Sequence, residues 1–335
     1  MDKSIHLGVL FGGKSGEHEV SLVSARSVLN TLDPQKYHIT EIGITLEGDW
    51  LVGEKTLEML SEKKFDRLSP AGMLPIPSRP DIYTISEVDQ GEMLQVFAEL
   101  DVIFPVLHGS FGEDGTMQGL FELADIAYVG AGVLGSSVGM DKALFKDVMI
   151  ANDIPVVPSI LVHRTELELM VDVLNRVDAF AEYPVFVKPA NMGSSVGVHK
   201  CHDIEGVAIG LQDAARFDRR ILVEKGVNAR EIELSVLGNQ SPRVSVPGEI
   251  RPTAEFYSYE AKYHDDSSEL FIPADLVDEQ IRLFQEYALR AYQAIDCAGM
   301  ARVDFLLDKD NGEIFLNELN TIPGFTPISM YPKLW

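Results

Sequence analysis

The stretch from Met300 to Phe325, MARVDFLLDKDNGEIFLNELNTIPGF, contains the pattern that decides the predicted fold. ARVDFLL and EIFLNEL each have the alternating composition of a β-strand. The Asp-Lys-Asp-Asn-Gly between them is typical of a tight turn. The stretch therefore predicts a β-hairpin near the end of the chain.

Four polar residues are predicted to share one face of this hairpin. With the turn centred on Asn311, Asp304 faces Glu318 and Arg302 faces Asn320. Two opposed carboxylates repel each other, and a hard divalent cation held by oxygens of Asp304, Glu318 and Asn320 would remove that repulsion. Arg302 is placed to hold a phosphate or an oxyanion. The alternative interpretation is an ordinary solvated polar face.

The composition bounds the class of protein. A length of 335 residues allows two or three domains, and 46% apolar residues is ordinary for a globular protein. The formal net charge of −24 argues against nucleic acid or an anionic membrane as a partner. Only two cysteines, no apolar run of membrane-spanning length and no signal-like start predict a cytoplasmic protein.

The N-terminus predicts a βαβ unit. IHLGVLF is a continuous apolar strand, a glycine-rich turn follows, a helix is expected over about 20–32, and HITEIGIT is the next strand. Residues 47–95 show less regular patterning. GVLFGGKS also matches the phosphate-loop pattern through Gly13, Lys14 and Ser15.

That phosphate loop conflicts with its context, because its Val-Leu-Phe lies in a strand interior and is not available to wrap phosphates. The glycine turn instead opens a helix whose N-terminus can hold an anion, and Glu17 beside it could take an ammonium group. A phosphate-loop NTPase that depends on Lys14 remains as an alternative.

Two later segments predict a nucleotide site. In VFVKPANMGSSVG, Lys188 follows buried strand residues and precedes a flexible loop that can close over phosphates. In LVEKGVNAREIE, Glu224, Lys225 and Val227 end a strand where adenine could bind, and Glu231 could reach a ribose hydroxyl.

Three further features, namely His108, Lys142 and the loop over residues 251–266, indicate a function only together with the segments above. His108 before a glycine-rich turn is by itself a structural histidine, and Lys142 at a helix start is by itself a solvated lysine. Residues 251–266 form a long aromatic loop that contains Lys262 and Tyr263, which favours a lid over a site. A helix with an apolar stripe is expected over about 276–296.

Taken together, these segments resemble the D-alanine–D-alanine ligases of the ATP-grasp superfamily over nearly the whole chain. The matching pieces are FGGKSGEHEVS, HGSFGEDGTMQG, MDK, VFVKPANMGSSVGV, LVEKGV, YEAKY, GMARVDF and NELNTIPGFTPISMYPKLW. The resemblance implies an α/β (α+β) protein with an ATP-grasp fold behind an N-terminal Rossmann-like domain. It implies three domains, at 1–135 for the first D-alanine, 136–223, and 224–335 for metal and second substrate. Family members continue past YPKLW into a helical segment, so incomplete packing behind the last domain is expected.

The resemblance also implies the reaction and its cofactors. ATP phosphorylates the carboxylate of one D-alanine, and the amine of a second D-alanine attacks the acyl phosphate, in peptidoglycan precursor synthesis. Two Mg²⁺ ions, with Mn²⁺ as an alternative metal, are implied at Asp304, Glu318 and Asn320. The implied ATP-binding residues are Lys142, Lys188, Glu224, Lys225, Val227, Glu231 and Lys262.

The remaining implied roles concern the amino acid substrates. Glu17 is implied to bind the ammonium group of the first D-alanine, with His108 nearby, and Ser194 and Tyr263 are implied to fix the loop and the substrate. Arg302 and the backbone amide of Gly324 are implied to stabilise the oxyanion. Ser329 is implied to bind the carboxylate of the second D-alanine. A homodimer is expected. The rivals are a D-alanine–D-lactate ligase, which the Tyr263-bearing lid argues against, and a non-enzymatic ATP-binding module.

Overall fold

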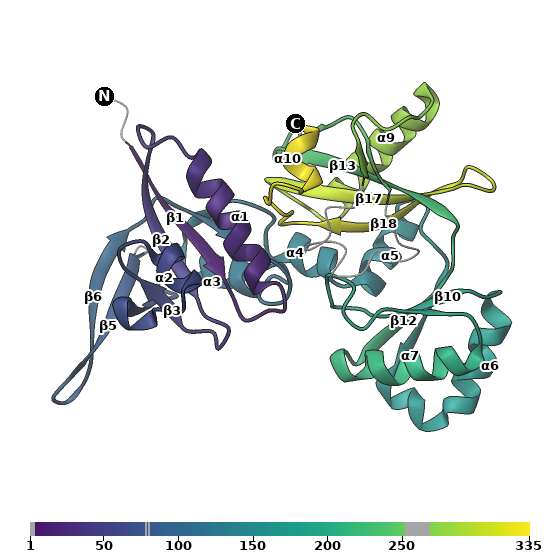
Figure 1. Ribbon diagram of the computed structural model, residues 1–335, viewed down its shortest axis with the longest axis horizontal. Helices are drawn as coiled ribbons and strands as arrows, with labels where there is room; N and C mark the ends of the chain where they lie inside the picture. Colours follow the sequence, from purple (N-terminus) through teal and green to yellow (C-terminus); the bar gives the residue numbers. More distant parts are fainter. Residues whose placement is uncertain (1–3, 78, 80, 252–268) are drawn as a thin grey trace. The chain divides into compact units, whose positions relative to one another are not determined.

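A computed structural model describes residues 4–77, 79, 81–251 and 269–335 (Figure 1). Its contacts divide the chain into two compact units. Unit 1 consists of Met1–Ser136, Ala298–Met300 and Thr321–Lys333. Unit 2 consists of Ser137–Cys297, Ala301–Asn320 and Leu334–Trp335. The last segments of the chain are therefore shared between the units, and the predicted hairpin lies almost wholly in unit 2.

Strands and helices alternate along much of the chain. The strands are β1 (Ile5–Gly12), β2 (Tyr37–Ile44), β3 (Trp50–Val52), β4 (Ser69–Met73), β5 (Asp81–Val88), β6 (Gly91–Glu99), β7 (Val102–Val106), β8 (Ala127–Tyr128), β9 (Ser159–His163), β10 (Val185–Pro189), β11 (His199–Cys201), β12 (Arg220–Lys225), β13 (Ala229–Leu237), β14 (Arg243–Val244), β15 (Gly248–Arg251), β16 (Glu269–Phe271), β17 (Met300–Asp308) and β18 (Ile314–Asn320). The α-helices are α1 (His18–Thr31), α2 (Thr56–Ser61), α3 (Thr116–Ala124), α4 (Val133–Met140), α5 (Lys142–Ala151), α6 (Met170–Phe180), α7 (Ile204–Phe217), α9 (Asp278–Ala294) and α10 (Met330–Leu334), and the short 3₁₀ turns are η1 (Phe65–Arg67) and η2 (Arg164–Leu169).

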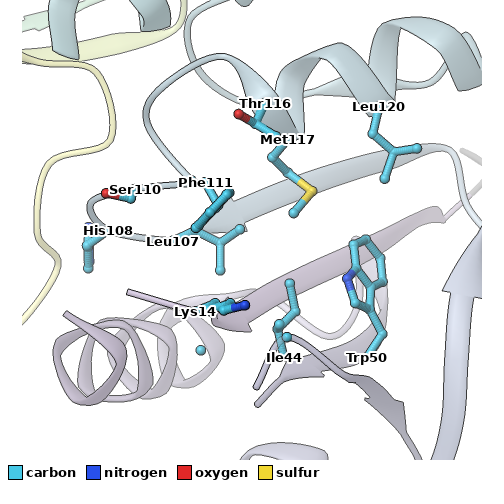
Figure 2. A pocket seen from close by; sticks show the side chains of 14 residues that line it. Lys14, Ile44, Trp50, Leu107, His108, Ser110, Phe111, Thr116, Met117 and Leu120 are labelled. Carbon is cyan, nitrogen blue, oxygen red and sulfur yellow. The ribbon is translucent and has the colours of Figure 1, made fainter. Parts of the chain in front are cut away.

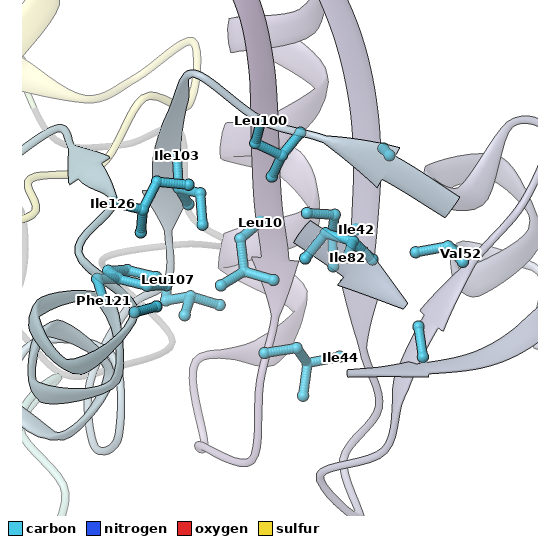
Figure 3. Close-up of a cluster of buried hydrophobic side chains, with 13 residues drawn as sticks. Leu10, Ile42, Ile44, Val52, Ile82, Leu100, Ile103, Leu107, Phe121 and Ile126 are labelled. Atoms are coloured by element: carbon cyan, nitrogen blue, oxygen red, sulfur yellow. The ribbon is translucent and has the colours of Figure 1, made fainter. Parts of the chain in front are cut away.

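Unit 1 is built on an eight-stranded sheet with the order β6-β5-β4-β3-β2-β1-β7-β8. The predicted βαβ unit is confirmed, because β1 pairs in parallel with β2 and with β7. Leu7, Val9 and Phe11 of β1 pack towards α1 and α2, while Leu10 packs into a second apolar cluster with Phe121 of α3 (Figure 3). A strand buried on both faces must be apolar throughout, which explains the run IHLGVLF.

The irregular stretch 47–95 forms four strands and a helix, which the sequence patterning did not predict. Strands β3 to β6 extend the sheet by antiparallel pairing. Nearly all residues of β6 are exposed, so the hydrophobic alternation that identifies a half-buried strand is absent there. Pairing with β5 supplies the stabilisation instead.

Unit 2 contains a four-stranded antiparallel sheet with the order β11-β10-β12-β9. Val185 and Val187 of β10 join the core formed with α6 and α7. Since side chains alternate along a strand, Lys188 projects to the opposite face. Glu224 shares that face, because it pairs with Phe186 across the two strands. Helix α5 covers this second face through Ala143.

A second, six-stranded sheet of unit 2 has the path β16-β15-β13-β17-β18, with β14 paired to β13. The predicted hairpin and its polar register are confirmed, since Asp304 pairs with Glu318 and Arg302 with Asn320. A bulge after Asp304 shifts the register of the rest of the hairpin by one residue. The predicted helix is α9, and its Phe284 packs on the hairpin.

Candidate functional site

Four charged side chains form what we call the lysine cluster, Lys142, Lys146, Lys188 and Glu224. The Glu224 carboxylate lies between two ammonium groups, 3.0 Å from Lys146 Nζ and 2.5 Å from Lys188 Nζ. Lys146 also donates a hydrogen bond to the carbonyl of Val157 at 2.9 Å. Lys142 donates to the carbonyl of Met192, in the loop after β10 that the sequence predicts to close over phosphates, at 2.7 Å. Helix α5 and two strands thus supply the cluster, in which two of the three lysines contact the single carboxylate.

The lysine cluster is buried enough for its charges to interact strongly. Glu224 is 4% exposed and Lys146 is 3% exposed. Burial alone would raise the pKa of the Glu224 carboxyl, but Lys188 and Lys146 outweigh it and hold this pKa below its ordinary value. Burial lowers the pKa of Lys146, and the positive charges of Lys188 and Lys142 oppose the attraction of Glu224. The cluster holds an excess of positive charge at its partly exposed members.

The opposite arrangement, which we call the acid cluster, consists of Arg302, Glu233, Asp304 and Glu318. Arg302 makes two parallel hydrogen bonds to Asp304, from Nε at 2.7 Å and from Nη2 at 2.6 Å. Its Nε also lies 3.0 Å from Oε2 of Glu233. Burial disfavours the arginine charge, but Asp304 and Glu233 raise the pKa of Arg302 well above its ordinary value. The acid cluster thus contains one positive charge and three carboxylates.

The two clusters meet at one contact within unit 2. Lys142 Nζ lies 3.8 Å from Oε2 of Glu318. With every group ionised, the lysine cluster carries two net positive charges and the acid cluster two net negative charges. A positive site beside a negative site suits a polyphosphate that carries a divalent cation.

The hairpin residues fit a divalent cation in part. Asp304 and Glu318 are opposed as predicted, and Arg302 and Lys142 supply the charge that offsets their repulsion. Asn320 donates its amide NH to Asp304 at 3.0 Å, so it must rotate to present its oxygen to a metal. In the part of the chain that the structure describes, no group of three or more His, Cys, Asp or Glu residues could hold a metal. A cation here therefore requires the Asn320 amide or ligand oxygens as well.

Glu17 lies in unit 1, in the turn between β1 and α1. Its backbone NH donates to Ser15 Oγ at 3.1 Å, and Ser15 Oγ donates to the carbonyl of His108 at 2.7 Å. Gly109, at φ +75°, packs so closely that a Cβ there would lie 2.5 Å from the Glu17 carboxylate. The turn after His108 therefore favours glycine at position 109, because of the positive φ and the nearby Glu17 carboxylate. Strand β1 runs through the would-be phosphate loop and buries Val9, as the sequence predicted.

His108 is buried and both of its ring nitrogens have partners. Nδ1 lies 3.1 Å from the carbonyl of Ile322, and Nε2 lies 2.9 Å from Ser24 Oγ. A carbonyl only accepts, so Nδ1 carries a proton and donates it to Ile322, while Nε2 shares a hydrogen bond with the Ser24 hydroxyl. The amide of Phe325 also donates to Ser24 Oγ. The histidine thus ties α1 to the segment that follows the hairpin, which agrees with the structural interpretation of His108.

A cavity of about 280 Å³ lies beside His108 in unit 1 (Figure 2). Its walls are mostly apolar, and include Ile44, Trp50, Met117 and Leu120. Lys14 reaches its edge, whereas Glu17 does not line it. This cavity lacks the pair of opposite charges that a zwitterionic amino acid requires.

Gly324 and Ser329 lie in the returning segment of unit 1. Ser329 Oγ accepts from the amide of Thr326 at 3.0 Å and lies 2.8 Å from its hydroxyl. A Cβ on Gly324 would approach Ser329 Oγ to 2.7 Å. The structure thus brings together the amide predicted for the oxyanion and the hydroxyl predicted for the second carboxylate.

The other predicted residues divide into two groups. Lys225, at the end of β12, is exposed, and Val227, Glu231 on β13 and Ser194 are partly buried. Their assignment to nucleotide and loop stays a prediction. Lys262 and Tyr263, with the rest of the predicted lid after residue 251, lie outside the described residues.

Sequence reasoning missed Lys146, Glu233 and Ser24. Lys146 follows Lys142 by four residues on α5, a spacing that places both on one helix face. Glu233 follows Glu231 by two residues on β13, and the same alternation places both on one face. Those signals were present. Nothing local to Ser24 indicates its partner, since His108 lies 84 residues away.

The two sheets of unit 2, with their oppositely charged clusters, define an ATP-grasp fold, which follows an N-terminal α/β unit in the sequence. Residues 6–131 match the family model described as D-ala D-ala ligase N-terminus, and residues 148–335 match D-ala D-ala ligase C-terminus. The chain belongs to the D-Ala–D-Ala ligase family.

Relatives and solved structures agree with this family. The chain is 47% identical over 330 residues to the D-alanine–D-alanine ligase of Heliobacterium modesticaldum, covering 98% of this chain and 89% of the relative. It is 50% identical over 341 residues to that of Ruminiclostridium cellulolyticum, covering 98% and 90%.

Among solved structures, VanG D-Ala:D-Ser ligase from Enterococcus faecalis has a TM-score of 0.86 at 34% identity, covering 99% of this chain and 94% of that one. The D-alanine-D-alanine ligase from Coxiella burnetii has a TM-score of 0.80 at 35% identity, covering 99% and 88%. None of the helices that the structure describes combines the length and apolar character of a membrane span.

Proposed function

We propose that this chain joins two D-alanine molecules to D-alanyl-D-alanine with hydrolysis of ATP to ADP and phosphate, for peptidoglycan precursor synthesis. The observation that carries the proposal is the contact between the lysine cluster and the acid cluster. Family membership supplies the substrate class, and the charge pattern supports a magnesium nucleotide as the co-substrate.

The lysine cluster is proposed to receive the phosphates. Lys142 and Lys188 are its partly exposed members, and each is now held by a protein oxygen. Phosphate oxygens can replace those protein acceptors as hydrogen-bond partners of the two ammonium groups. Glu224, Lys225, Val227 and Glu231 are proposed for the adenosine part, with Lys262 from the predicted lid.

The acid cluster is proposed to hold two Mg²⁺ ions, with Mn²⁺ as an alternative, through Asp304, Glu318 and Asn320. The bound metal supplies positive charge that offsets the phosphates and polarises their oxygens. Asp304 and Glu233 raise the pKa of Arg302 well above its ordinary value, so its guanidinium is charged near neutral pH. It is therefore suited to stabilise the oxyanion that forms when an amine adds to an acyl phosphate.

Unit 1 is proposed to supply the amino acid contacts. Glu17 is proposed to bind the ammonium group of the first D-alanine through its carboxylate. The two buried hydrogen bonds of the His108 ring hold the surrounding loops in place. The Gly324 amide is proposed for the oxyanion and Ser329 for the carboxylate of the second D-alanine. Attack by the second amine breaks the acyl–phosphate bond, forms the peptide bond and releases phosphate.

ADP release tests this proposal. Purified protein with ATP and Mg²⁺ should release ADP when D-alanine is added, and release little with L-alanine or without an amino acid. Mass spectrometry should then find one dipeptide for each ADP. ADP release that does not depend on D-alanine would overturn the assignment in favour of a simple ATPase.

D-serine is a second candidate for the nucleophile, since one similar structure is described as a D-Ala:D-Ser ligase. D-lactate is the third. Competition among D-alanine, D-serine and D-lactate near neutral pH, with product analysis, ranks them. We expect D-alanyl-D-alanine to predominate, and a predominant ester or D-alanyl-D-serine would replace it as the product.

The predicted cytoplasmic location and homodimer belong to the same proposal. Light scattering on the purified protein measures its mass, and a value near twice 37.0 kDa is expected.

A further inference from the structure

Lys146 is the most deeply buried charge of the lysine cluster and has no role in the reaction described above. Its side chain is 4% exposed, whereas the side chains of Lys142 and Lys188 are 14% and 13% exposed. Its ammonium lies beneath Glu224, bonded to the Val157 carbonyl.

Glu224 needs two counter-ions because its surroundings exclude water. Its two oxygens contact different lysines, Oε1 with Lys146 and Oε2 with Lys188. A buried carboxylate that loses its partners is strongly destabilising. Any step that draws Lys188 away therefore requires that Lys146 remain.

We propose that Lys146 is a positioning residue for nucleotide binding that acts through Glu224. It fixes one oxygen of Glu224 so that the other aims Lys188 at the phosphate site. When Lys188 turns to a phosphate, Lys146 remains as the counter-ion of Glu224. This inference rests on the proposed function, which assigns the phosphates to Lys188.

The alternative is that Lys146 only fills and stabilises the space under α5. The two roles differ in how Lys146 and Glu224 depend on each other. If Lys146 acts through Glu224, then neutralising Glu224 removes the need for a counter-ion. A purely structural Lys146 would be equally important with either residue at position 224.

A double-mutant cycle distinguishes them, with Lys146→Met, Glu224→Gln and the double variant. Binding of ADP and of a non-hydrolysable ATP analogue, with Mg²⁺, is measured by calorimetry on the full chain. We expect Lys146→Met to weaken nucleotide binding about 10- to 100-fold, and by less than about threefold in the Glu224→Gln background. Thermal unfolding without nucleotide checks that each variant is folded.

Lys36→Met is the matched control, because it removes the same charge from an exposed lysine of unit 1. It should leave nucleotide affinity unchanged. Equal losses from Lys146→Met in both backgrounds, or no loss at all, would overturn the inference while leaving the proposed function intact. Tight nucleotide binding without D-alanine-dependent turnover would overturn the function and leave the inference standing. A parent protein that binds no nucleotide would overturn both.

If Lys146→Met does not fold, Lys146→Gln removes the charge and keeps an NH donor on the Val157 side, on a side chain that is one atom shorter. It should show the same dependence on Glu224, and an equal loss in both backgrounds would again overturn the inference.

Discussion

The lysine cluster and the acid cluster are charge-inverted versions of one design. In the first, a single buried carboxylate orients two lysines, and in the second a single arginine orients two carboxylates. Glu224 reduces the repulsion among the lysines, and Arg302 reduces the repulsion among the carboxylates. The lysine cluster keeps an excess of positive charge and the acid cluster an excess of negative charge. Pre-arranged excess charge lowers the cost of organising a site when the ligand binds.

The comparison separates what each cluster can bind. The lysine cluster ends in ammonium groups that donate hydrogen bonds, so it selects phosphate oxygens. The acid cluster ends in carboxylate oxygens on a hairpin, so it selects a hard cation. The contact between Lys142 and Glu318 brings both excesses to one place. The predictions below test each cluster in turn.

The largest effect is expected from Glu318→Gln in the acid cluster. Losing a charged metal ligand should lower turnover by about a thousandfold, roughly 4 kcal/mol of transition-state stabilisation. Steady-state ADP release with D-alanine measures it. Glu313→Gln in the exposed turn of the same hairpin is the control. Near-normal turnover at saturating Mg²⁺ would remove Glu318 from the metal site.

Lys188→Ala tests the lysine cluster. Removing the partner that Glu224 shares with a phosphate should weaken ATP binding about 100-fold, and Lys14→Ala should weaken it by less than about threefold. Titration of the nucleotide into both variants decides the ranking. The reverse order would contradict the cluster and revive the phosphate loop.

Gly324→Ala tests the segment of Gly324 and Ser329, which is proposed for the second D-alanine and lies outside both charged clusters. The new Cβ must displace the Ser329 hydroxyl from 2.7 Å, since φ at Gly324 is not in the left-handed region and the backbone tolerates alanine. We expect KM for the second D-alanine to rise about tenfold, with nucleotide affinity unchanged. Gly119→Ala, where a Cβ meets open space, is the control. An unchanged KM would detach Ser329 from that substrate.

The smallest effect on nucleotide affinity is expected at Glu249, a buried carboxylate outside both clusters, which Arg230 and Arg251 hold by paired hydrogen bonds. These hydrogen bonds, against the opposing effect of burial, lower the pKa of Glu249 from 4.5 to about 2. A lowered pKa stabilises the fold above the unfolded value and loses that effect as pH falls from 4.5 to about 2.

Glu249→Gln should therefore cost roughly 2–3 kcal/mol at neutral pH and progressively less towards pH 2. Denaturant unfolding at several pH values measures this difference, and nucleotide affinity should change by less than about threefold. A stability difference that does not depend on pH would show that the ion pairs contribute little.

The sequence by itself determined the local elements and the shared hairpin face of Arg302, Asp304, Glu318 and Asn320. Strand β1 follows from its apolar run, and the Asp-Lys-Asp-Asn-Gly turn predicts the hairpin, but the pairing of Asp304 with Glu318 also depends on the bulge after Asp304. These features depend on residues close together in the chain, where spacing alone specifies the face. Strand β6 was not predicted because nearly all of its residues are exposed and its pairing with β5 stabilises it.

Only the tertiary structure decided how distant residues combine. Lys146 and Glu224 are 78 positions apart, and no periodicity relates a residue on α5 to one on β12. The bond between His108 and Ile322 spans 214 positions. Such pairs form because each buried polar group must find a partner once water is excluded, and the identity of that partner is set by the packing of whole elements.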